Sequence, residues 1–268
     1  MQEPSRQSGP RQVSLPFRLL NRRTQRISGS LLATRLALGP DASPHNLLVF
    51  GAGAQIAAHT TLLLRHYSGS LKRCIIYNRS LNVRVERLVK SFQEEFASVT
   101  FICRQTPVDP HDIGDDVDGL QSDVGSSDII CAATPSTKAL FPSSFVRLGT
   151  HLNLVGSYTP RMMEVETSLI RRAGLLMVDS RSACMVEAGE FIAAGVRPED
   201  VCEVGELLGA DSEAPRFPDY SGDRVTIFKS VGLGVQDVAI AQMVVDLAER
   251  RGVGCKLNSY DDFNTTAA

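Results

Sequence analysis

The sequence predicts an α/β protein of the doubly wound class, with a mostly parallel sheet covered by helices on both faces. Short runs that are almost continuously apolar alternate with stretches of helical periodicity, as expected for parallel strands buried on both sides. The first such run, residues 47–50, breaks into Gly51 and Gly53 and then opens a helical pattern. This order predicts a strand, a tight turn and the start of a helix.

The composition favours a globular protein with a small ligand. The chain has 268 residues, of which 43% are hydrophobic and 22% charged, enough for one or two domains. Its net charge is -2 and no long run has one sign, so we expect neither nucleic acid nor an anionic membrane as partner. No apolar run is long enough to span a bilayer.

The cysteines and histidines predict no metal site. Six cysteines are scattered without a CxxC pair, which is typical of reduced residues in a cytoplasmic protein. None of the five histidines has the i, i+4 spacing of a zinc helix. A GxSxG elbow and a P-loop lysine are also missing, so the sequence supports neither acyl transfer by serine nor NTP hydrolysis.

The elements follow in order from a polar leader. Residues 1–21 are rich in Pro, Gln, Ser and Arg and are predicted to be disordered. An amphipathic helix is predicted from residue 22 to Leu38, where Gly39-Pro40 ends it. The first strand follows, and the helix after the glycines is expected to end near Tyr67.

Five further strands are predicted over residues 74–77, 99–103, 128–133, 151–156 and 175–179. Between and after them we expect helices over 81–97, 181–194 and 235–250, a polar connection over 107–125, and a short strand or turn over 226–230. Ligands of this class bind at the carboxyl ends of the strands. The candidate positions are therefore Gly51 to Gln55, Asn78 to Ser80, Thr134 to Ser136, and the end of the fifth strand with the loop after it, Val155 and Gly156 to Thr159.

The glycine turn predicts a dinucleotide site. Gly51 allows a sharp turn off the strand, and Gly53 has no Cβ, so a pyrophosphate can approach the positive helix N-terminus at Ala54 and Gln55. The third small position of the fingerprint is replaced by Ile56. The alternative is an ordinary strand-to-helix turn.

The end of the second strand favours NADP over NAD. NAD-preferring sites place an acid there, whereas this chain has Asn78-Arg79-Ser80. A guanidinium can bind a 2'-phosphate through two N–H groups. The alternative is that Ser80 or Asn78 caps the next helix and Arg79 is solvated. Thr134 similarly either lines the sugar and phosphate region or belongs to a strand end stopped by Pro135.

Several motifs in sequence order point to one family: Gly51-Ala52-Gly53-Ala54-Gln55, Tyr77-Asn78-Arg79-Ser80, Cys131-Ala132-Ala133-Thr134-Pro135-Ser136, Leu152 to Pro160, Val178-Asp179-Ser180-Arg181, Glu187-Ala188-Gly189-Glu190 and Phe228-Lys229-Ser230-Val231-Gly232. From about Arg22 to the C-terminus, the chain resembles the ornithine cyclodeaminase/mu-crystallin family. The resemblance implies a Rossmann-type domain, a second domain for substrate and dimerisation, NAD(P)-linked chemistry on amino acids or cyclic imines, and a homodimer.

On this resemblance, the chain divides into a leader (1–21), a helix and linker of the inter-domain region (22–45), the Rossmann-type domain (46–220) and a segment with a long helix that returns to an incomplete second domain (221–268). The resemblance also implies cofactor contacts: Ala54 and Gln55 to the pyrophosphate, Asn78 to Ser80 to the adenosine ribose or its phosphate, Thr134 and Ser230 to the nicotinamide end, and either Arg23 or Arg26 from the first helix.

Two departures from the family pattern bear on activity. Cyclodeaminating members carry an aspartate after the fifth strand, where this chain has Tyr158, a poor general base but the catalytic candidate here. The family's N-terminal segment with the Lys and Arg that hold the substrate carboxylate does not precede Arg22. We expect an NADPH-dependent ketimine reductase-like oxidoreductase acting slowly on imines of small amino or imino acids. The alternatives are a non-catalytic NADPH-binding protein and an ornithine cyclodeaminase.

Overall fold

The fold is that of a computed structural model, which describes residues 23–110, 115–208 and 224–254. The predicted leader, residues 1–21, lies outside these ranges. Among the described helices, none has both the length and the apolar character needed to cross a membrane.

The core of the fold is one eight-stranded sheet, and all its strand pairs are parallel. The strands are β1 (Asn46–Phe50), β2 (Arg73–Asn78), β3 (Thr100–Gln105), β4 (Ile129–Ala132), β5 (His151–Leu154), β6 (Leu175–Val178), β7 (Cys202–Glu203) and β8 (Thr226–Lys229). Their order is β3-β2-β1-β4-β5-β8-β6-β7. The chain reverses its direction of winding between β1 and β4, which is where such sheets open a ligand crevice.

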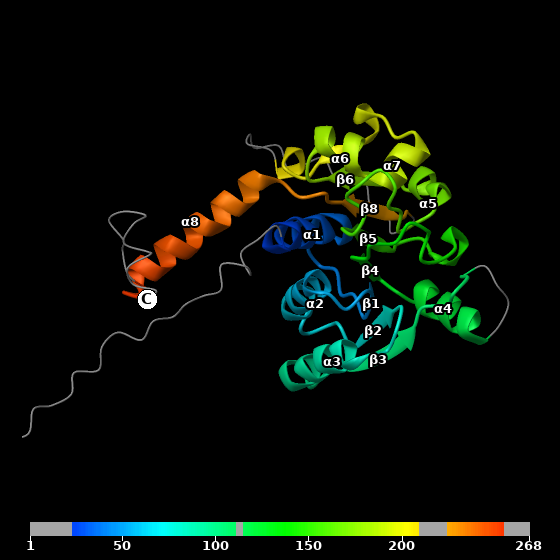
Figure 1. Ribbon diagram of the computed structural model, residues 1–268, viewed down its shortest axis with the longest axis horizontal. Coiled ribbons are helices and arrows are strands. Elements are labelled where there is room, and N and C mark those ends of the chain that lie inside the picture. The colour runs from blue at the N-terminus through cyan, green and yellow to red at the C-terminus, as the bar shows by residue number, and fades with distance from the viewer. Residues whose placement is uncertain (1–22, 111–114, 209–223, 255–268) are drawn as a thin grey trace, which may run out of the picture.

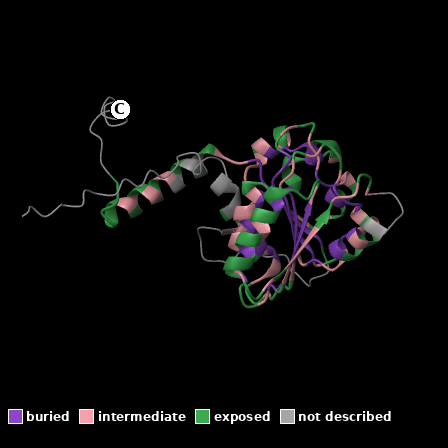
Figure 2. Cartoon of the chain, turned by 60° about the horizontal axis from the view of Figure 1, so that its bottom comes forward, coloured by how far each residue is buried: buried purple, intermediate pink, exposed green. Residues whose placement is uncertain are grey.

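Helices cover both faces of the sheet (Figure 1). They are α1 (Arg23–Leu38), α2 (Ala54–His66), α3 (Val83–Glu95), α4 (Asp115–Gly125), α5 (Thr167–Arg172), α6 (Arg181–Glu187), α7 (Gly189–Ala194) and α8 (Gly234–Arg250). Along β1, Leu47 and Val49 pack with α2 and α3, whereas Leu48 and Phe50 pack with α4, α5 and α7. Figure 2 shows this buried layer between the helices. The doubly wound prediction is confirmed.

Two element predictions need correction, and a third is decided between its alternatives. The stretch 107–125 contains α4 and is not only a polar connection. The predicted helix 181–194 is two helices, because the chain turns at Ala188 so that Gly189 can lie against the loop after β5. A Cβ on Gly189 would stand 1.9 Å from the carbonyl oxygen of Met162, so only glycine fits. The stretch 226–230, predicted as a short strand or turn, contains the strand β8, which lies between β5 and β6.

The first and last helices differ in how they pack. The first helix, α1, packs on the sheet: Ala33 is buried with Phe228 of β8, and Asn153 of β5 donates a hydrogen bond to Thr34 at 3.0 Å. The last helix, α8, extends away from the sheet beyond α1 (Figure 1). Four of its large apolar side chains are 45–69% exposed, namely Val238, Met243, Val245 and Leu247.

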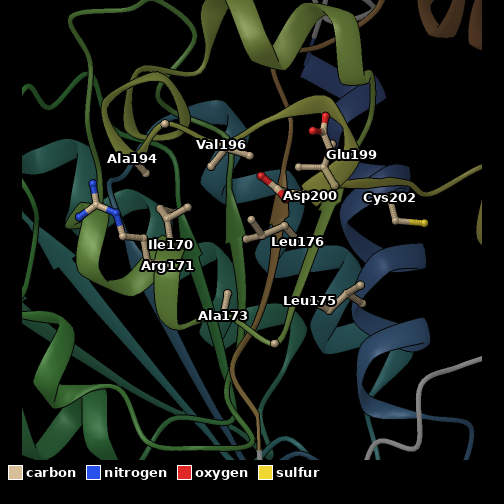
Figure 3. A pocket seen from close by; sticks show the side chains of 13 residues that line it. Ile170, Arg171, Ala173, Leu175, Leu176, Ala194, Val196, Glu199, Asp200 and Cys202 are labelled. Atoms are coloured by element: carbon tan, nitrogen blue, oxygen red, sulfur yellow. The ribbon is translucent and has the colours of Figure 1, made fainter.

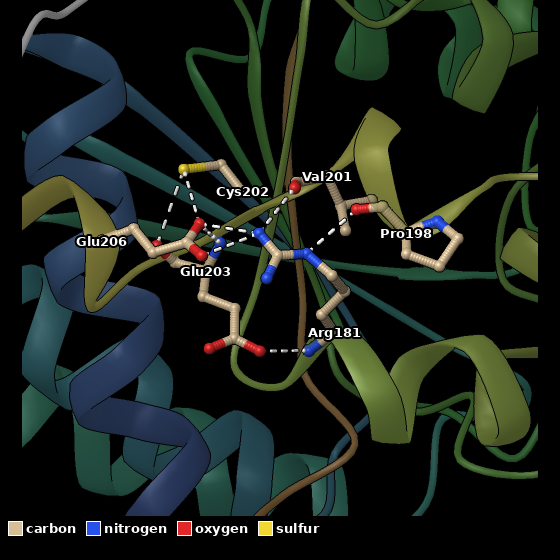
Figure 4. Close-up of polar contacts among 6 residues, drawn as sticks. All are labelled: Arg181, Pro198, Val201, Cys202, Glu203 and Glu206. Atoms are coloured by element: carbon tan, nitrogen blue, oxygen red, sulfur yellow. Dashed lines mark hydrogen bonds and ion pairs between the residues drawn. The ribbon is translucent and has the colours of Figure 1, made fainter.

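An arginine ties the edge strand β7 to the rest of the sheet (Figure 4). The Arg181 guanidinium donates to both carboxylate oxygens of Glu206 at 2.8 Å and to the carbonyl oxygen of Pro198 at 2.9 Å. Its backbone N–H donates to Glu203 of β7 at 2.7 Å. These contacts support a strand of two residues, which is too short for periodicity to reveal.

The buried His151 predicts a pH dependence of stability. Burial lowers the pKa of His151 to about 3, and its Nδ1 lies 2.8 Å from the hydroxyl oxygen of Thr226. Below its ordinary pKa of 6.5 the unfolded chain binds a proton there that the folded chain does not. The free energy of unfolding should therefore fall as the pH falls from 6.5 towards 3, by up to about 1.4 kcal/mol for each pH unit.

Urea unfolding of the wild type and of His151→Gln at several pH values measures this contribution. The variant should show a shallower loss of stability at acid pH, whereas a change at the exposed His45, His45→Gln, should keep the wild-type slope. Parallel curves for the wild type and His151→Gln would contradict the assignment.

Candidate functional site

The turn after β1 is held in place by its backbone. Gly51 has φ 111°, in the region that favours glycine, and its N–H donates to the carbonyl oxygen of Tyr77 at 2.7 Å. A Cβ on Gly51 would lie 3.1 Å from the carbonyl oxygen of Ala133, at the end of β4. Gly51 is therefore required by the turn itself, as the sequence predicts.

Gly53 has a different role, because nothing crowds it. It is the N-cap of α2 without a side-chain cap, and a Cβ there would meet no atom within 4 Å. It lies on a hollow of about 550 Å³ lined by Ala52, Gly53, Ala54, Ala57, Arg84, Arg87 and Leu88. The N-terminus of α2, the positive end of the helix dipole, therefore borders an open space that two arginines also line, which suits an anion.

The end of β2 leaves Arg79 available. The helix α3 is capped by Asn82, whose side chain accepts from the N–H groups of Arg84 and Val85. The alternative in which Asn78 or Ser80 caps this helix is therefore wrong. Asn78 instead donates to the carbonyl oxygen of Ser80 at 2.7 Å. Arg79 is exposed and forms no ion pair within the described part of the chain.

Arg84 and Arg87 are cofactor candidates that the sequence reasoning missed. They stand three residues apart in the first turns of α3, so both reach the hollow beside Gly53 and Ala54. The i, i+3 spacing of two basic residues just after the β2 end was the available indication. Together with the exposed Arg79 at the end of β2, they place three arginines near the glycine turn.

A buried carboxylate joins the ends of β4 and β5. Glu164 is fully buried and accepts from the N–H and the hydroxyl of Thr134 at 2.7 and 2.9 Å, and from the N–H of Gly156 at 2.7 Å. Glu164 thus holds Thr134 and Gly156 together at neighbouring strand ends. Val155, the predicted candidate before Gly156, is buried. Glu164 lies outside the sequence-predicted set.

A second carboxylate fixes the loop after β8. Asp179, which follows β6, accepts from the Ser230 hydroxyl and from the Gly232 N–H, both at 2.7 Å. Ser230 is fully buried, so its predicted contact with the nicotinamide end requires an approach at this loop. Just before it, Lys229 lies 3.0 Å from Glu190 of α7, and both side chains are fully buried.

The remaining candidates are placed as follows. Tyr158 is 45% exposed in the loop after β5, at the edge where Thr134 and Gly156 lie. Gln55 is in the first turn of α2. The side chains of Arg23 and Arg26 lie outside the described residues, although α1 begins at Arg23. Within the described residues, no group of three or more His, Cys, Asp or Glu side chains is arranged to hold a metal ion.

Another hollow lies at the opposite edge of the sheet (Figure 3). It measures about 460 Å³ and is bordered by the amino ends of β6 and β7, at Leu175 and Cys202, with Arg171, Glu199 and Asp200 at its rim. Glu199 and Asp200 are already paired with Arg197. Because its place is at the amino ends of the strands, this hollow is separate from the glycine turn.

The parallel sheet, the glycine turn at its crossover point and the basic hollow beside it define a Rossmann-type dinucleotide-binding protein. The family model for the ornithine cyclodeaminase/mu-crystallin family matches residues 23–252. The chain belongs to this family, and the family resemblance predicted from its motifs is confirmed.

Individual relatives agree with this assignment. Protein SAR DEFICIENT 4 of Arabidopsis thaliana is 34% identical over 83% of this chain and 63% of its own length. The Delta(1)-pyrroline-2-carboxylate reductase of Colwellia psychrerythraea is 31% identical over 81% of this chain and 63% of its own length. The chain thus spans less than two thirds of either relative.

A solved structure shares the fold. The Delta(1)-pyrroline-2-carboxylate reductase of Thermococcus litoralis, in complex with NADH and L-proline, superposes with a TM-score of 0.70 at 19% identity, over 88% of this chain and 68% of that one.

The two glycines of the turn should respond differently to alanine. Gly51→Ala forces a side chain into a positive φ and against Ala133, and should cost about 1–3 kcal/mol of unfolding free energy. Gly53→Ala has φ -87° and open space, so its stability should stay near the wild type, while its Cβ obstructs the approach of a pyrophosphate. Denaturant unfolding and fluorescence titration with NADPH separate the two effects. Equal stability losses would refute this distinction.

Proposed function

We propose that the chain is an NADP-dependent oxidoreductase that transfers a hydride between NADPH and an imine of a small amino or imino acid. The observation that carries the proposal is the open glycine turn at Gly53, bordered by Arg84 and Arg87 and near the acid-free end of β2. The family assignment and the names of the pyrroline-carboxylate reductase relatives support the same chemistry.

The chain's own residues would bind and orient the cofactor. The N–H groups at the start of α2 and the arginines of α3 suit its phosphates, and Arg79 suits the 2'-phosphate of the adenosine ribose. Thr134 and Ser230 line the nicotinamide end at β4 and β8 in this proposal. Bound NADPH would supply the hydride, and Tyr158, exposed after β5, would support proton transfer to the imine nitrogen directly or through water.

The preference for NADPH over NADH is the first test. Because Arg79 can pair with a 2'-phosphate that NADH lacks, Arg79→Ala should weaken NADPH selectively, by about 1.5–3 kcal/mol. Arg84→Ala and Arg87→Ala should weaken NADPH as well, since their side chains border the same hollow. Arg171→Ala, at the opposite edge of the sheet, is the matched control and should bind both cofactors normally. A wild type that prefers NADH would overturn the NADP assignment.

Turnover distinguishes an enzyme from a binding protein. Incubation with NADPH and pyrroline-2-carboxylate should consume NADPH faster than NADPH alone, and Tyr158→Phe should slow this reaction while leaving NADPH binding intact. NADPH binding without consumption would favour the non-catalytic alternative. With ornithine and NAD no proline should form, because Tyr158 stands where cyclodeaminating relatives carry a carboxylate. Clear proline formation, followed by chromatography, would instead favour the cyclodeaminase.

We also propose that α8 leads from the Rossmann-type domain towards the second domain and mediates a homodimer. The β8 strand before it belongs to the main sheet, whereas α8 exposes four large apolar side chains. A cytoplasmic location fits the free thiols of Cys74, Cys103, Cys131, Cys184 and Cys202, whereas Cys255 lies outside the described residues.

Light scattering tests the dimer. The wild type should have the mass of two chains, and Met243→Lys should shift it towards one chain, because a charge would have to be buried at the contact. Val186→Lys, at an equally exposed residue of α6, is the control and should remain dimeric. A monomeric wild type at high concentration would refute the proposal.

A further inference from the structure

The Glu164 side chain accepts hydrogen bonds from two different strand ends. Its two carboxylate oxygens accept from different residues. Oε1 accepts both hydrogen bonds from Thr134, and Oε2 accepts the hydrogen bond from Gly156. The donors follow β4 and β5, which are neighbours in the sheet. One side chain therefore sets the distance between two strand ends at the candidate nicotinamide edge.

Gly156 is tightly packed against Thr134 and the Glu164 carboxylate. A Cβ on Gly156 would stand 2.2 Å from the carbonyl oxygen of Thr134 and 2.4 Å from Oε1 of Glu164. Only glycine fits at this position, although its backbone needs no unusual φ. The loop after β5 thus packs closely against Thr134 and Glu164. The position of Thr134 depends on its hydrogen bonds to Glu164.

Buried charges surround Glu164. Burial raises the pKa of Glu164, the nearby Lys229 opposes that effect and Glu190 adds to it. Lys229 comes from β8 and Glu190 from α7, and all three side chains are fully buried. The Lys229 ammonium and the N–H donors of Thr134 and Gly156 lower the pKa of Glu164 and so act against the effect of burial, which is the largest and raises it.

The hydrogen-bond direction at Thr134 has a chemical consequence. Its hydroxyl has one hydrogen, and that hydrogen is donated to the acceptor-only carboxylate of Glu164. The Thr134 hydroxyl oxygen can then only accept further hydrogen bonds. A ligand group beside Thr134 must then donate, as the amide NH₂ of a nicotinamide carboxamide does.

We propose that Glu164 is a positioning residue that holds Thr134 as a hydrogen-bond acceptor for the carboxamide of the nicotinamide ring. The proposal rests on the proposed function, in which Thr134 lies at the nicotinamide end. It assigns no proton transfer to Glu164, which acts through Thr134 and Gly156 alone.

The test compares NADPH with its reduced 3-acetylpyridine analogue, in which a methyl ketone replaces the carboxamide and no N–H remains. The wild type should bind NADPH about tenfold more tightly than the analogue, the worth of one hydrogen bond. Thr134→Val should abolish this preference. Glu164→Gln should abolish it too and weaken NADPH and NADH equally, because an amide cannot accept from all three donors.

Two controls separate positioning from general damage. Glu166→Gln changes another carboxylate that accepts a backbone N–H, from Ser143 at 2.6 Å, and should keep the wild-type preference for the carboxamide. Arg79→Ala should change the NADPH to NADH ratio and leave the carboxamide preference unchanged. Circular dichroism and thermal unfolding establish that each variant is folded.

The outcomes are distinct. A wild type that binds neither NADPH nor NADH refutes the proposed function. A wild type that binds NADPH, with a folded Glu164→Gln that still prefers the carboxamide, refutes the positioning role alone. If Glu164→Gln does not fold, Thr134→Val decides: a retained preference refutes the inference, and a lost preference supports it.

Discussion

At the carboxyl ends of the parallel strands, backbone N–H groups lack a neighbouring strand and need other hydrogen-bond acceptors. The acceptor at each strand end shapes the candidate cofactor site. At β4 and β5 the partner is the Glu164 carboxylate, and at β6 and β8 it is Asp179. The end of β1 is different, because the chain turns directly into α2 and the N–H groups after Gly53 receive no side-chain cap. The strand ends that bind a buried carboxylate fix the shape of the site, whereas the end of β1, which binds none, is accessible to a ligand.

The two halves of this edge consequently have opposite electrostatic character. Beside the glycine turn lie the positive N-terminus of α2 and the arginines Arg84 and Arg87. Across the crossover point, under β5 and β8, lie the buried carboxylates of Glu164 and Glu190 with the single ammonium of Lys229. A dinucleotide with phosphates at one end and an amide-bearing ring at the other matches this distribution of charge.

Much of the fold was predictable because its strands are short, apolar and buried on both faces, so β1 to β6 lie within about two residues of their predicted bounds. Local patterns could not predict what tertiary contacts decide. The break at Ala188 depends on the close approach of Gly189 to Met162, and β7 depends on Arg181. In the site, glycines and strand ends were visible in the sequence.

Glu164 was not predictable in this way, because nothing near it in the chain marks it as buried. Its role follows from two donors that are 30 and 8 residues away in the sequence. Two carboxylates and one ammonium that are fully buried stabilise a core poorly, because the desolvation of charges can exceed their attraction. Apolar residues of similar volume often stabilise a core better. An apolar side chain, however, cannot accept hydrogen bonds from two strand ends and a hydroxyl at once. We infer that Glu164 is charged for the geometry that it imposes on Thr134 and Gly156 rather than for stability.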